Sequence, residues 1–427
     1  MTGEPSTRGS ELLAGDAVLR SSLGWAARLW AGSGQRLLDR IDAGLLSGAI
    51  HARLPDGTRR VLGGRAPGFE AVVNLNNWRA LLRLATGGSI GWYQAWEASE
   101  WDSPDPVPLF ALFMDNAESL GSAGRASGLG RYIARALHWL NRNTRSGARR
   151  NIHAHYDLGN DFYAQWLGGT MAYSSAIFED SPKPSRWQQR LSPLDYAQLA
   201  KITTITNRAG VGAGDRVLEI GCGWGAQAFT LAGTGAEVVA ISLSDEQLES
   251  CLSRPKGKEL RVEFRKQDYR DVDEIFDAIV SVEMVEAVGR EYWPHFFDCL
   301  SRCLKPGGRA VLQFISIRES IFPSYAASAD FIQGYIFPGG MLASEAEFRR
   351  LAGERGLAWT DDVDFGLHYA ETLRIWRENF DAAVAEGRMP AGFDQRFIRL
   401  WRYYLMYCEG GFRGGGIDVV QVTLVKR

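Results

Sequence analysis

The stretch Val217-Leu-Glu-Ile-Gly-Cys-Gly-Trp-Gly225 runs from an apolar strand directly into a glycine-rich turn. Gly221, Gly223 and Gly225 lack a Cβ atom, so the backbone can turn tightly there and approach a ligand closely. Glu219 places an acid at the last buried position of the strand. Glycine turns of this kind also cradle the pyrophosphate of dinucleotides at a helix N-terminus. The turn alone therefore indicates a nucleotide-like ligand without choosing one.

The form Glu-x-Gly-x-Gly-x-Gly resembles the S-adenosylmethionine (SAM) site of the Rossmann-like methyltransferases, whose ligand has no phosphate to cradle. Several apolar stretches downstream are predicted strands that alternate with helical segments, which favours βαβ units and a parallel sheet. These stretches are Val238–Ser244, Glu263–Asp271, Phe276–Val282 and, after a turn at Leu304–Gly308, Ala310–Ile315. Ligands of such sheets bind at the carboxyl ends of the strands. A Rossmann-like domain for another nucleotide is the alternative.

The composition is that of an ordinary globular protein, with 427 residues, 45% of them hydrophobic, and a net charge of −2. This charge offers no global attraction to nucleic acid. The five cysteines show no spacing typical of a metal site, which favours a reducing compartment and predicts no bound metal. The sequence has no apolar run long enough to span a membrane, and its polar N-terminus is unlike a signal peptide. We therefore expect a cytoplasmic protein.

Four parts are predicted along the chain: an N-terminal extension (1–36), a small α+β domain (37–116), a basic linker (117–152) and a catalytic domain (153–427). The linker carries seven arginines between Glu118 and Ile152, with apolar residues and Trp139 between them. A basic amphipathic helix of this kind can lie on an anionic membrane surface. The alternative is a solvated linker helix that packs on the main domain. The small domain could mediate homodimerisation or present the active site to a bilayer.

Six further blocks resemble, in order, those of the cyclopropane-fatty-acyl-phospholipid synthases. They are His155–Tyr163, Met171–Ser175, Gln267–Asp271, Tyr335–Gly340, Tyr369–Trp376 and Tyr403–Arg413. The resemblance covers residues from about 150 to the C-terminus, and the N-terminal domain is similar to that of the two-domain members. It implies an α/β fold: a Rossmann-like class I SAM methyltransferase domain with a mainly parallel seven-stranded sheet, preceded by a small α+β domain.

The resemblance implies an enzyme that uses SAM to alkylate the cis double bond of an unsaturated acyl chain in a membrane phospholipid, through a carbocation. We expect a C-methylated chain that is not cyclised, with closure of a cyclopropane ring as the alternative. We also expect peripheral contact with the inner face of the membrane. A small-molecule methyltransferase and a catalytically silent lipid-binding protein are less favoured. A nucleic-acid partner is disfavoured because the basic residues concentrate in one linker.

The resemblance also implies two sets of site residues. The residues expected to bind SAM are Tyr173, Ser174, Glu219, Gly221, Gly223, Gly225, Ser242, Leu243, Gln247, Asp268 and Tyr269. Among these, an acid at 268 can accept from the adenine amino group and a tyrosine at 269 can cover the ring. The residues expected in catalysis are Glu283, Glu286, Tyr369, Ser175, Gln313 and His155. His155 is expected to bind locally or to shape the pocket.

Three of these positions depart from the family pattern. In the cyclopropane synthases a cysteine and a histidine, together with a glutamate and a tyrosine, hold a bicarbonate ion that serves as the base. Here the cysteine is Ser175, the histidine is Gln313, and a nearby glycine is Glu283. Two carboxylates and an anion in a dry pocket would repel one another. We therefore hypothesise that Glu283 replaces bicarbonate as the base or as the counter-charge of the carbocation. The alternatives are a bound bicarbonate, which serine and glutamine can still hydrogen-bond, and a Glu283 that points elsewhere and pairs with an arginine at the pocket rim.

Overall fold

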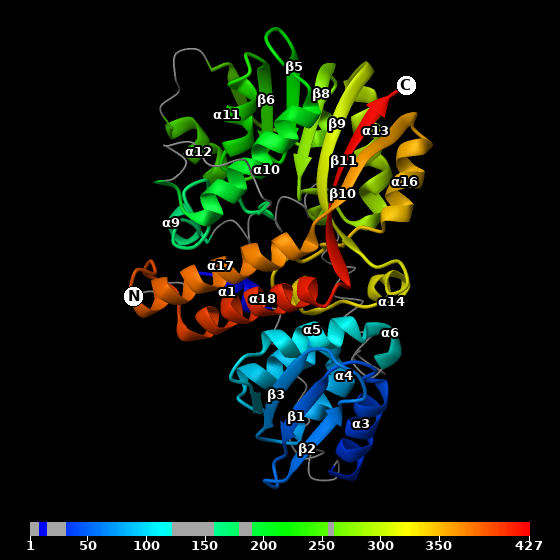
Figure 1. Ribbon diagram of the computed structural model, residues 1–427. Helices are drawn as coiled ribbons and strands as arrows, with labels where there is room; N and C mark the ends of the chain where they lie inside the picture. The colour runs from blue at the N-terminus through cyan, green and yellow to red at the C-terminus, as the bar shows by residue number, and fades with distance from the viewer. Residues whose placement is uncertain (1–7, 15–30, 122–157, 179–189, 255–259) are drawn as a thin grey trace. The chain divides into compact units, whose positions relative to one another are not determined.

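A computed structural model describes residues 8–14, 31–121, 158–178, 190–254 and 260–427 (Figure 1). The chain divides into two compact units. The first contains the described part of Met1–Arg142 with Arg318–Gly339 and Ala391–Ile417, and the second contains that of Asn143–Ile317 with Gly340–Pro390 and Asp418–Arg427. The predicted domain bounds, with 153–427 as one continuous stretch, remain predictions. No described helix is both long enough and apolar enough to cross a membrane.

The second unit is built on a seven-stranded sheet with the order β10-β11-β9-β8-β5-β6-β7. Its strands are β5 (Arg216–Ile220), β6 (Glu237–Ser242), β7 (Val262–Lys266), β8 (Phe276–Val282), β9 (Leu304–Ile317), β10 (Leu357–Asp364) and β11 (Ile417–Lys426). The pairs β5–β6, β6–β7, β5–β8 and β8–β9 are parallel, and β10–β11 is antiparallel. The predicted mainly parallel α/β sheet is confirmed.

Helices cover this sheet and connect its strands. They are α9 (Asn160–Tyr163), α10 (Pro193–Ala209), α11 (Ala226–Ala232), α12 (Asp245–Ser253), α13 (Trp293–Cys303), α16 (Glu345–Gly353) and α17 (Gly366–Ala385). Three 3₁₀ turns, η3 (Tyr269–Asp271), η4 (Val285–Ala287) and η5 (Arg290–Tyr292), follow strand ends. The central strands are buried along nearly their whole length, as parallel strands with covered faces are.

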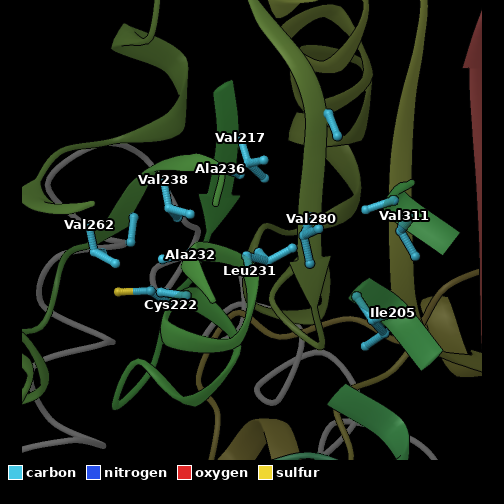
Figure 2. Close-up of a cluster of buried hydrophobic side chains, with 14 of the residues drawn as sticks. Ile205, Val217, Cys222, Leu231, Ala232, Ala236, Val238, Val262, Val280 and Val311 are labelled. Atoms are coloured by element: carbon cyan, nitrogen blue, oxygen red, sulfur yellow. The ribbon is translucent and has the colours of Figure 1, made fainter. Parts of the chain in front are cut away.

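The core of the second unit lies between these central strands and the helices packed on them. Figure 2 shows valines of four strands, Val217, Val238, Val280 and Val311, that meet side chains from α10 and α11. Helix α10 begins where the Ser192 hydroxyl accepts from the backbone N–H of Asp195, and it ends at the left-handed Gly210. Backbone groups at both ends of α10 thus find hydrogen-bond partners in the adjacent sequence.

Two predicted segments differ from the structure in detail. The turn expected at Leu304–Gly308 lies within the span of β9, where the register to β8 shifts between Phe276–Leu304 and Ala278–Arg309. The additional residues of β9 are accommodated as an irregularity in the pairing, with Gly307 at φ 78°. The strand expected at Glu263–Asp271 ends at Lys266, because the Asp268 carboxylate accepts from the N–H of Arg270 and starts η3.

The first unit has a four-stranded sheet with the order β2-β1-β3-β4. The strands are β1 (Ala49–Arg53), β2 (Arg59–Gly63), β3 (Glu70–Leu75) and β4 (Trp101–Asp102). The helices are α1 (Ser10–Ala14), α3 (Ala31–Gly44), α4 (Arg79–Glu97), α5 (Val107–Asp115), α6 (Ala117–Leu120), α14 (Phe322–Ala326), α15 (Phe331–Tyr335) and α18 (Gln395–Arg413). Strands β1 and β2 form an antiparallel hairpin, and the Leu54 N–H donates to the carbonyl of Thr58 across the turn.

Candidate active site

The predicted site residues gather at the carboxyl ends of four neighbouring strands. Glu219 lies in β5, and Ser242 is the last residue of β6. Asp268 follows β7, and Glu283 follows β8. Since the strand order is β8-β5-β6-β7, these four positions form a row along one edge of the sheet. This edge is where ligands of open α/β sheets bind.

The glycine turn after β5 leaves space for a ligand. Gly221, Gly223 and Gly225 all have positive φ angles, which side chains rarely adopt. A Cβ atom at Gly221 would lie 2.8 Å from Met284, and one at Gly225 would lie 3.0 Å from the Cys251 sulfur. A Cβ atom at Gly223 would meet nothing within 4 Å. The middle glycine thus presents bare backbone to open space, which fits a cofactor that lies against the turn.

The polar residues after β6 are held by one another. The Ser242 hydroxyl donates to Gln247 Oε1 at 3.0 Å, and the Ser244 hydroxyl accepts from the Gln247 N–H at the start of α12. Leu243 lies between them and is half-buried. This arrangement fixes a loop that carries three of the residues expected to bind SAM, Ser242, Leu243 and Gln247.

Asp268 is already bound within the chain. Its carboxylate forms a two-point ion pair with Arg270, at 2.8 Å to Nε and 2.6 Å to Nη2. The sequence did not indicate Arg270, although an arginine two residues after an acid is a simple signal. Any bond from adenine to Asp268 would therefore add to this pair. Tyr269 is buried beside it, and its hydroxyl has no hydrogen-bond partner among the described residues. Burial raises the pKa of this hydroxyl.

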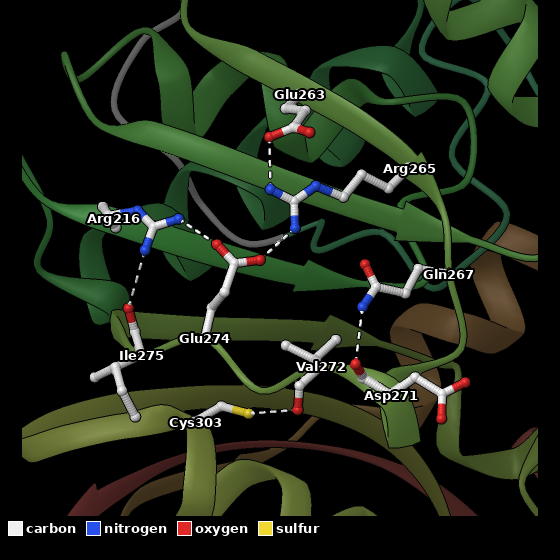
Figure 3. Close-up of polar contacts among 9 residues, drawn as sticks. All are labelled: Arg216, Glu263, Arg265, Gln267, Asp271, Val272, Glu274, Ile275 and Cys303. Atoms are coloured by element: carbon white, nitrogen blue, oxygen red, sulfur yellow. Dashed lines mark hydrogen bonds and ion pairs between the residues drawn. The ribbon is translucent and has the colours of Figure 1, made fainter.

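The neighbouring segment is fixed by a network of its own (Figure 3). Glu274 binds both Arg216 and Arg265, and each arginine lies in a different strand. Gln267 Nε2 donates to the carbonyl of Asp271 at 3.1 Å. Glu274 thus links β5 to β7, and the Gln267 bond stabilises the turn that carries Asp268 and Tyr269.

Glu283 receives hydrogen bonds from three directions. Its Oε1 accepts from the Ser175 N–H at 2.9 Å and from Gln313 Nε2 at 2.7 Å, and Tyr369 is a further side-chain partner. Gln313 is itself oriented, because its Oε1 accepts from Gln421 Nε2 at 2.9 Å. Burial raises the pKa of Glu283, and these donors oppose the rise. The structure thus brings Ser175, Gln313 and Tyr369 together around this one carboxylate.

The backbone at Glu283 is in the left-handed region, with φ at 47°. Residues other than glycine rarely adopt it, and holding one there costs on the order of 1–3 kcal/mol. A glycine would adopt this conformation freely. The chain therefore keeps a backbone shape that suits glycine and places a carboxylate on it.

The other glutamate has a different environment. Glu286 lies in η4, and its Oε1 accepts from the Ile315 N–H. Its Oε2 is buried and has no hydrogen-bond partner among the described residues. Burial, together with repulsion from Glu283, raises the pKa of Glu286 to about 8. At neutral pH Glu286 is thus mostly protonated, whereas the donors around Glu283 stabilise negative charge on that carboxylate.

The segment from Ser175 to Phe178 is held at every backbone N–H. Ser175 donates to Glu283, Ala176 to Thr372 Oγ1, Ile177 to the carbonyl of Ala197, and Phe178 to His368 Nδ1. The Ser175 hydroxyl instead donates to the carbonyl of Ala176 at 3.0 Å. Ser175 therefore serves Glu283 through its backbone, and His368 holds a loop in place.

Aromatic rings lie near this segment. The Tyr173 ring lies 5.5 Å from both Trp166 and Trp376 between ring centroids, and Trp376 lies 5.8 Å from Tyr369. Electron-rich ring faces attract cations. Such a group can accommodate positive charge next to the Glu283 carboxylate.

Two buried ionisable groups complete the site, and burial raises the pKa of one of them, Glu219, well above its ordinary value. Glu219 has a carboxylate oxygen, Oε2, without a partner among the described residues. Lys201 of α10 donates to the Ser174 hydroxyl at 2.6 Å and was not predicted as a site residue. Its signal was available: Gln198 and Lys201 are polar residues three apart on a helix face that otherwise buries Ala197, Ile202 and Ile205. His155 lies outside the described residues. No group of three potential metal ligands occurs in the described ranges.

Comparison with known proteins gives a consistent result. Residues 143–422 match the family model for mycolic acid cyclopropane synthetase. Tuberculostearic acid methyltransferase UfaA1 of Mycobacterium tuberculosis is 38% identical over 361 residues, which cover 81% of this chain and 80% of that protein. Cyclopropane-fatty-acyl-phospholipid synthase of Escherichia coli is 36% identical over 274 residues, which cover 64% of this chain and 66% of that one.

The fold comparison agrees with the sequence comparison. A crystal structure of mycolic acid cyclopropane synthase CmaA1 with SAH and CTAB matches with a TM-score of 0.58 and 30% identity, over 65% of this chain and 98% of that one. Cyclopropane synthase MmaA2 of M. tuberculosis matches with the same TM-score of 0.58 and 27% identity, over 65% of this chain and 98% of that one. The chain therefore belongs to the mycolic acid cyclopropane synthetase family and is a SAM-dependent methyltransferase of the kind that modifies fatty acyl chains.

Proposed function

We propose that this enzyme methylates the cis double bond of an unsaturated acyl chain in a membrane phospholipid, with Glu283 as the base and counter-charge, and that its product is a C-methylated chain without a ring. The observation that carries the proposal is the Glu283 carboxylate, held at a left-handed backbone position by Ser175, Gln313 and Tyr369. Strained positions persist where the surrounding structure enforces them, and they cluster at active sites.

When bound, SAM supplies an electrophilic methyl group on a positively charged sulfur. The row of residues from Asp268 to Glu283 would place this sulfur near the β5 and β8 ends of the sheet. One alkene carbon forms the new bond to the methyl group as the sulfur–methyl bond breaks, and the neighbouring carbon becomes cationic. The aromatic rings around Tyr173 and the Glu283 carboxylate stabilise that charge in a site that excludes water.

Glu283 then determines the product by the proton it takes. If it removes a proton from a chain carbon next to the cation, those electrons form a new double bond and the methyl branch remains. If it removes a proton from the new methyl group, the electrons close a cyclopropane ring. Glu286 stays protonated at neutral pH and does not compete as a base. We favour the branched product because the base is a fixed side chain and not a mobile ion.

Bicarbonate has no clear role in this arrangement. An anion at the site would need hydrogen-bond donors, and the Ser175 N–H, Gln313 and Tyr369 already bind Glu283. Adding a second negative charge beside this carboxylate would be unfavourable in a buried site. We therefore propose that catalysis proceeds without bicarbonate.

The relatives support both candidate products. The name of the UfaA1 relative describes a methyltransferase, whereas the E. coli relative and the CmaA1 and MmaA2 structures carry the name of cyclopropane synthases. Ring closure is therefore the second candidate. The phospholipid substrate follows the E. coli name, and peripheral contact with the cytoplasmic face of the membrane follows from that substrate. The basic linker expected to make this contact lies almost wholly outside the described residues.

The direct test of Glu283 is Glu283→Gln, which keeps the size of the side chain and removes its charge. We expect turnover on vesicles of monounsaturated phospholipid to fall by roughly 10²- to 10⁴-fold, as for loss of a general base. The exposed Glu291→Gln is the matched control and should retain wild-type turnover. Normal turnover of Glu283→Gln would sink the proposed role. Liposome binding by the wild type tests the lipid substrate against a soluble acceptor.

A further inference from the structure

Lys201 is a buried cation with little local compensation. Its side chain belongs to α10, is 3% exposed, and donates one hydrogen bond, to Ser174 Oγ at 2.6 Å. No carboxylate of the described residues lies within ion-pair distance of it. Lysine is almost never buried without partners, because the ammonium group loses its hydration. An ammonium group has three N–H donors, so two of them remain for something else.

The direction of this hydrogen bond determines what Ser174 can do. An ammonium group only donates, so the Ser174 oxygen must accept. The hydroxyl proton of Ser174 is then free to point away from Lys201, and no described group accepts it. A serine polarised by a buried cation, with its proton unused, is a donor prepared for a negatively charged acceptor. Lys201 and Ser174 together therefore favour binding of a negatively charged group.

The location of the pair indicates which anion. Lys201 binds the Ser174 hydroxyl, and the next residue, Ser175, donates its N–H to Glu283 directly after β8, so the pair lies near the β8 end of the row, beside β5. Asp268, expected at the adenine, stands at the opposite end of the row, after β7. A SAM molecule laid along the row would thus have its methionine part at β5 and β8. That part carries an α-ammonium and an α-carboxylate group.

The two free partners at this end match those two groups. Glu219 is 3% exposed, and its Oε2 lacks a partner among the described residues. A buried carboxylate oxygen of this kind suits an ammonium group. Ser174 and Lys201 suit a carboxylate group. Glu219 would thus bind the α-ammonium group, and Lys201 with Ser174 would bind the α-carboxylate group. Once the cofactor is bound, each of these buried groups has a partner of opposite charge.

We propose that Lys201 is a positioning residue for the α-carboxylate of the cofactor, acting through the Ser174 hydroxyl that it polarises. Burial lowers the pKa of Lys201 to about 8, while Glu219 and Glu283 oppose this shift, so the ammonium is mostly charged at pH 7. The inference rests on SAM as the cofactor and not on the lipid substrate. Its test therefore uses cofactor binding alone.

The experiment compares two ligands that differ only in the carboxylate group. Calorimetry at pH 7 would measure the affinity of the full-length enzyme for S-adenosylhomocysteine and for its decarboxylated analogue. We expect the wild type to prefer S-adenosylhomocysteine. Lys201→Met should lower the affinity for S-adenosylhomocysteine by about tenfold to a hundredfold, the usual effect of losing a charged hydrogen-bond partner. It should lower the affinity for the decarboxylated analogue less than about twofold, because the analogue has no carboxylate group for Lys201 to recognise.

Gln198→Met is the matched control. Gln198 is a buried neighbour on α10, and its Nε2 donates to the carbonyl of Ser174 at 2.8 Å. Its loss disturbs the same segment without removing a charge, so both ligands should weaken equally. Lys201→Arg should keep the preference for the carboxylate, and Ser174→Ala should lose it even if Lys201→Met fails to fold.

An equal loss of affinity for both ligands in Lys201→Met and in Ser174→Ala would overturn the proposal and leave Lys201 a structural residue. Unchanged binding of S-adenosylhomocysteine in both variants would overturn it as well. A failure of the lipid proposal would instead appear only in product assays, with this binding pattern intact.

Discussion

Glu283 is the residue on which the proposed chemistry of this site depends. Its backbone φ angle of 47° would suit glycine, and its carboxylate collects the donors that an anion would otherwise use. Replacing it by glycine would relieve the backbone strain and free the Ser175 N–H, Gln313 and Tyr369 together. This single substitution would thus make the three donors available again to a bound anion.

We expect Glu283→Gly to lose most of its activity without bicarbonate and to recover part of it when bicarbonate is added. The released donors can then bind the small anion in place of the side chain. Steady-state rates at increasing bicarbonate, at fixed pH and ionic strength, would measure this. The wild type should show no such dependence. A glycine variant that ignores bicarbonate would contradict this explanation of the donor set.

Glu286 gives the protein a pH-dependent stability. Its pKa is near 4.5 in the unfolded chain and about 8 in the fold. Between these values the folded state holds a proton that the unfolded state has lost, so the contribution of Glu286 to the free energy of unfolding falls as pH rises. We expect Glu286→Gln to remove this pH-dependent loss of stability. The free energy of unfolding of the variant, relative to that of the wild type, should therefore increase from pH 5 to pH 8.5. Denaturant unfolding at the two pH values measures the difference; a constant difference would count against the raised pKa.

The residues that the sequence could identify were those whose chemistry stands out from a pattern. Glu283 was visible because an acid stood where a glycine was expected, and Gln313 because an amide replaced a ring. The sequence did not show that Ser175 acts through its backbone N–H and turns its hydroxyl to Ala176. Hydrogen-bond direction depends on three-dimensional geometry, which composition and spacing do not contain. Lys201 was missed for another reason: its place on the buried face of α10 follows from helical spacing, but this signal was not used.

At the scale of elements, hydrophobic periodicity predicted the central strands well. The buried stretches of β5, β6 and β8 are mostly apolar, so they could be recognised directly. The end of β7 was placed too late, because the Asp268 carboxylate starts a 3₁₀ turn by local capping. Local side-chain bonds of this kind compete with strand pairing and shift element ends by a few residues.

Helix α18 packs closely on α5 at a glycine. A Cβ atom at Gly410 would lie 2.4 Å from Phe110 Cβ and 2.8 Å from the carbonyl oxygen of Val107. We expect Gly410→Ala to destabilise the protein by about 1–3 kcal/mol, the usual cost of overpacking. Gly353 of α16 is the control, since a Cβ atom there meets nothing within 4 Å and alanine favours a helix. Thermal unfolding of both variants would show the contrast, and equal midpoints would contradict the close packing.

At the scale of the whole molecule, the sequence could not show how the two compact units share the chain. Arg318–Gly339 and Ala391–Ile417 join the unit of the N-terminal residues, although each follows catalytic segments in sequence. The apolar pattern of α18 predicts a buried face without saying which core covers it. Such assignments depend on long-range packing, which a single sequence does not reveal.

The fate of the methyl hydrogens tests the central claim most directly. Cells rich in monounsaturated phospholipid that express this chain would be fed methionine with a CD₃ methyl group, and their lipids analysed by mass spectrometry. We predict that acyl chains retain all three deuterium atoms, because Glu283 takes its proton from the chain and not from the new methyl group. Acyl chains that retain only two deuterium atoms, within a saturated ring, would contradict the account.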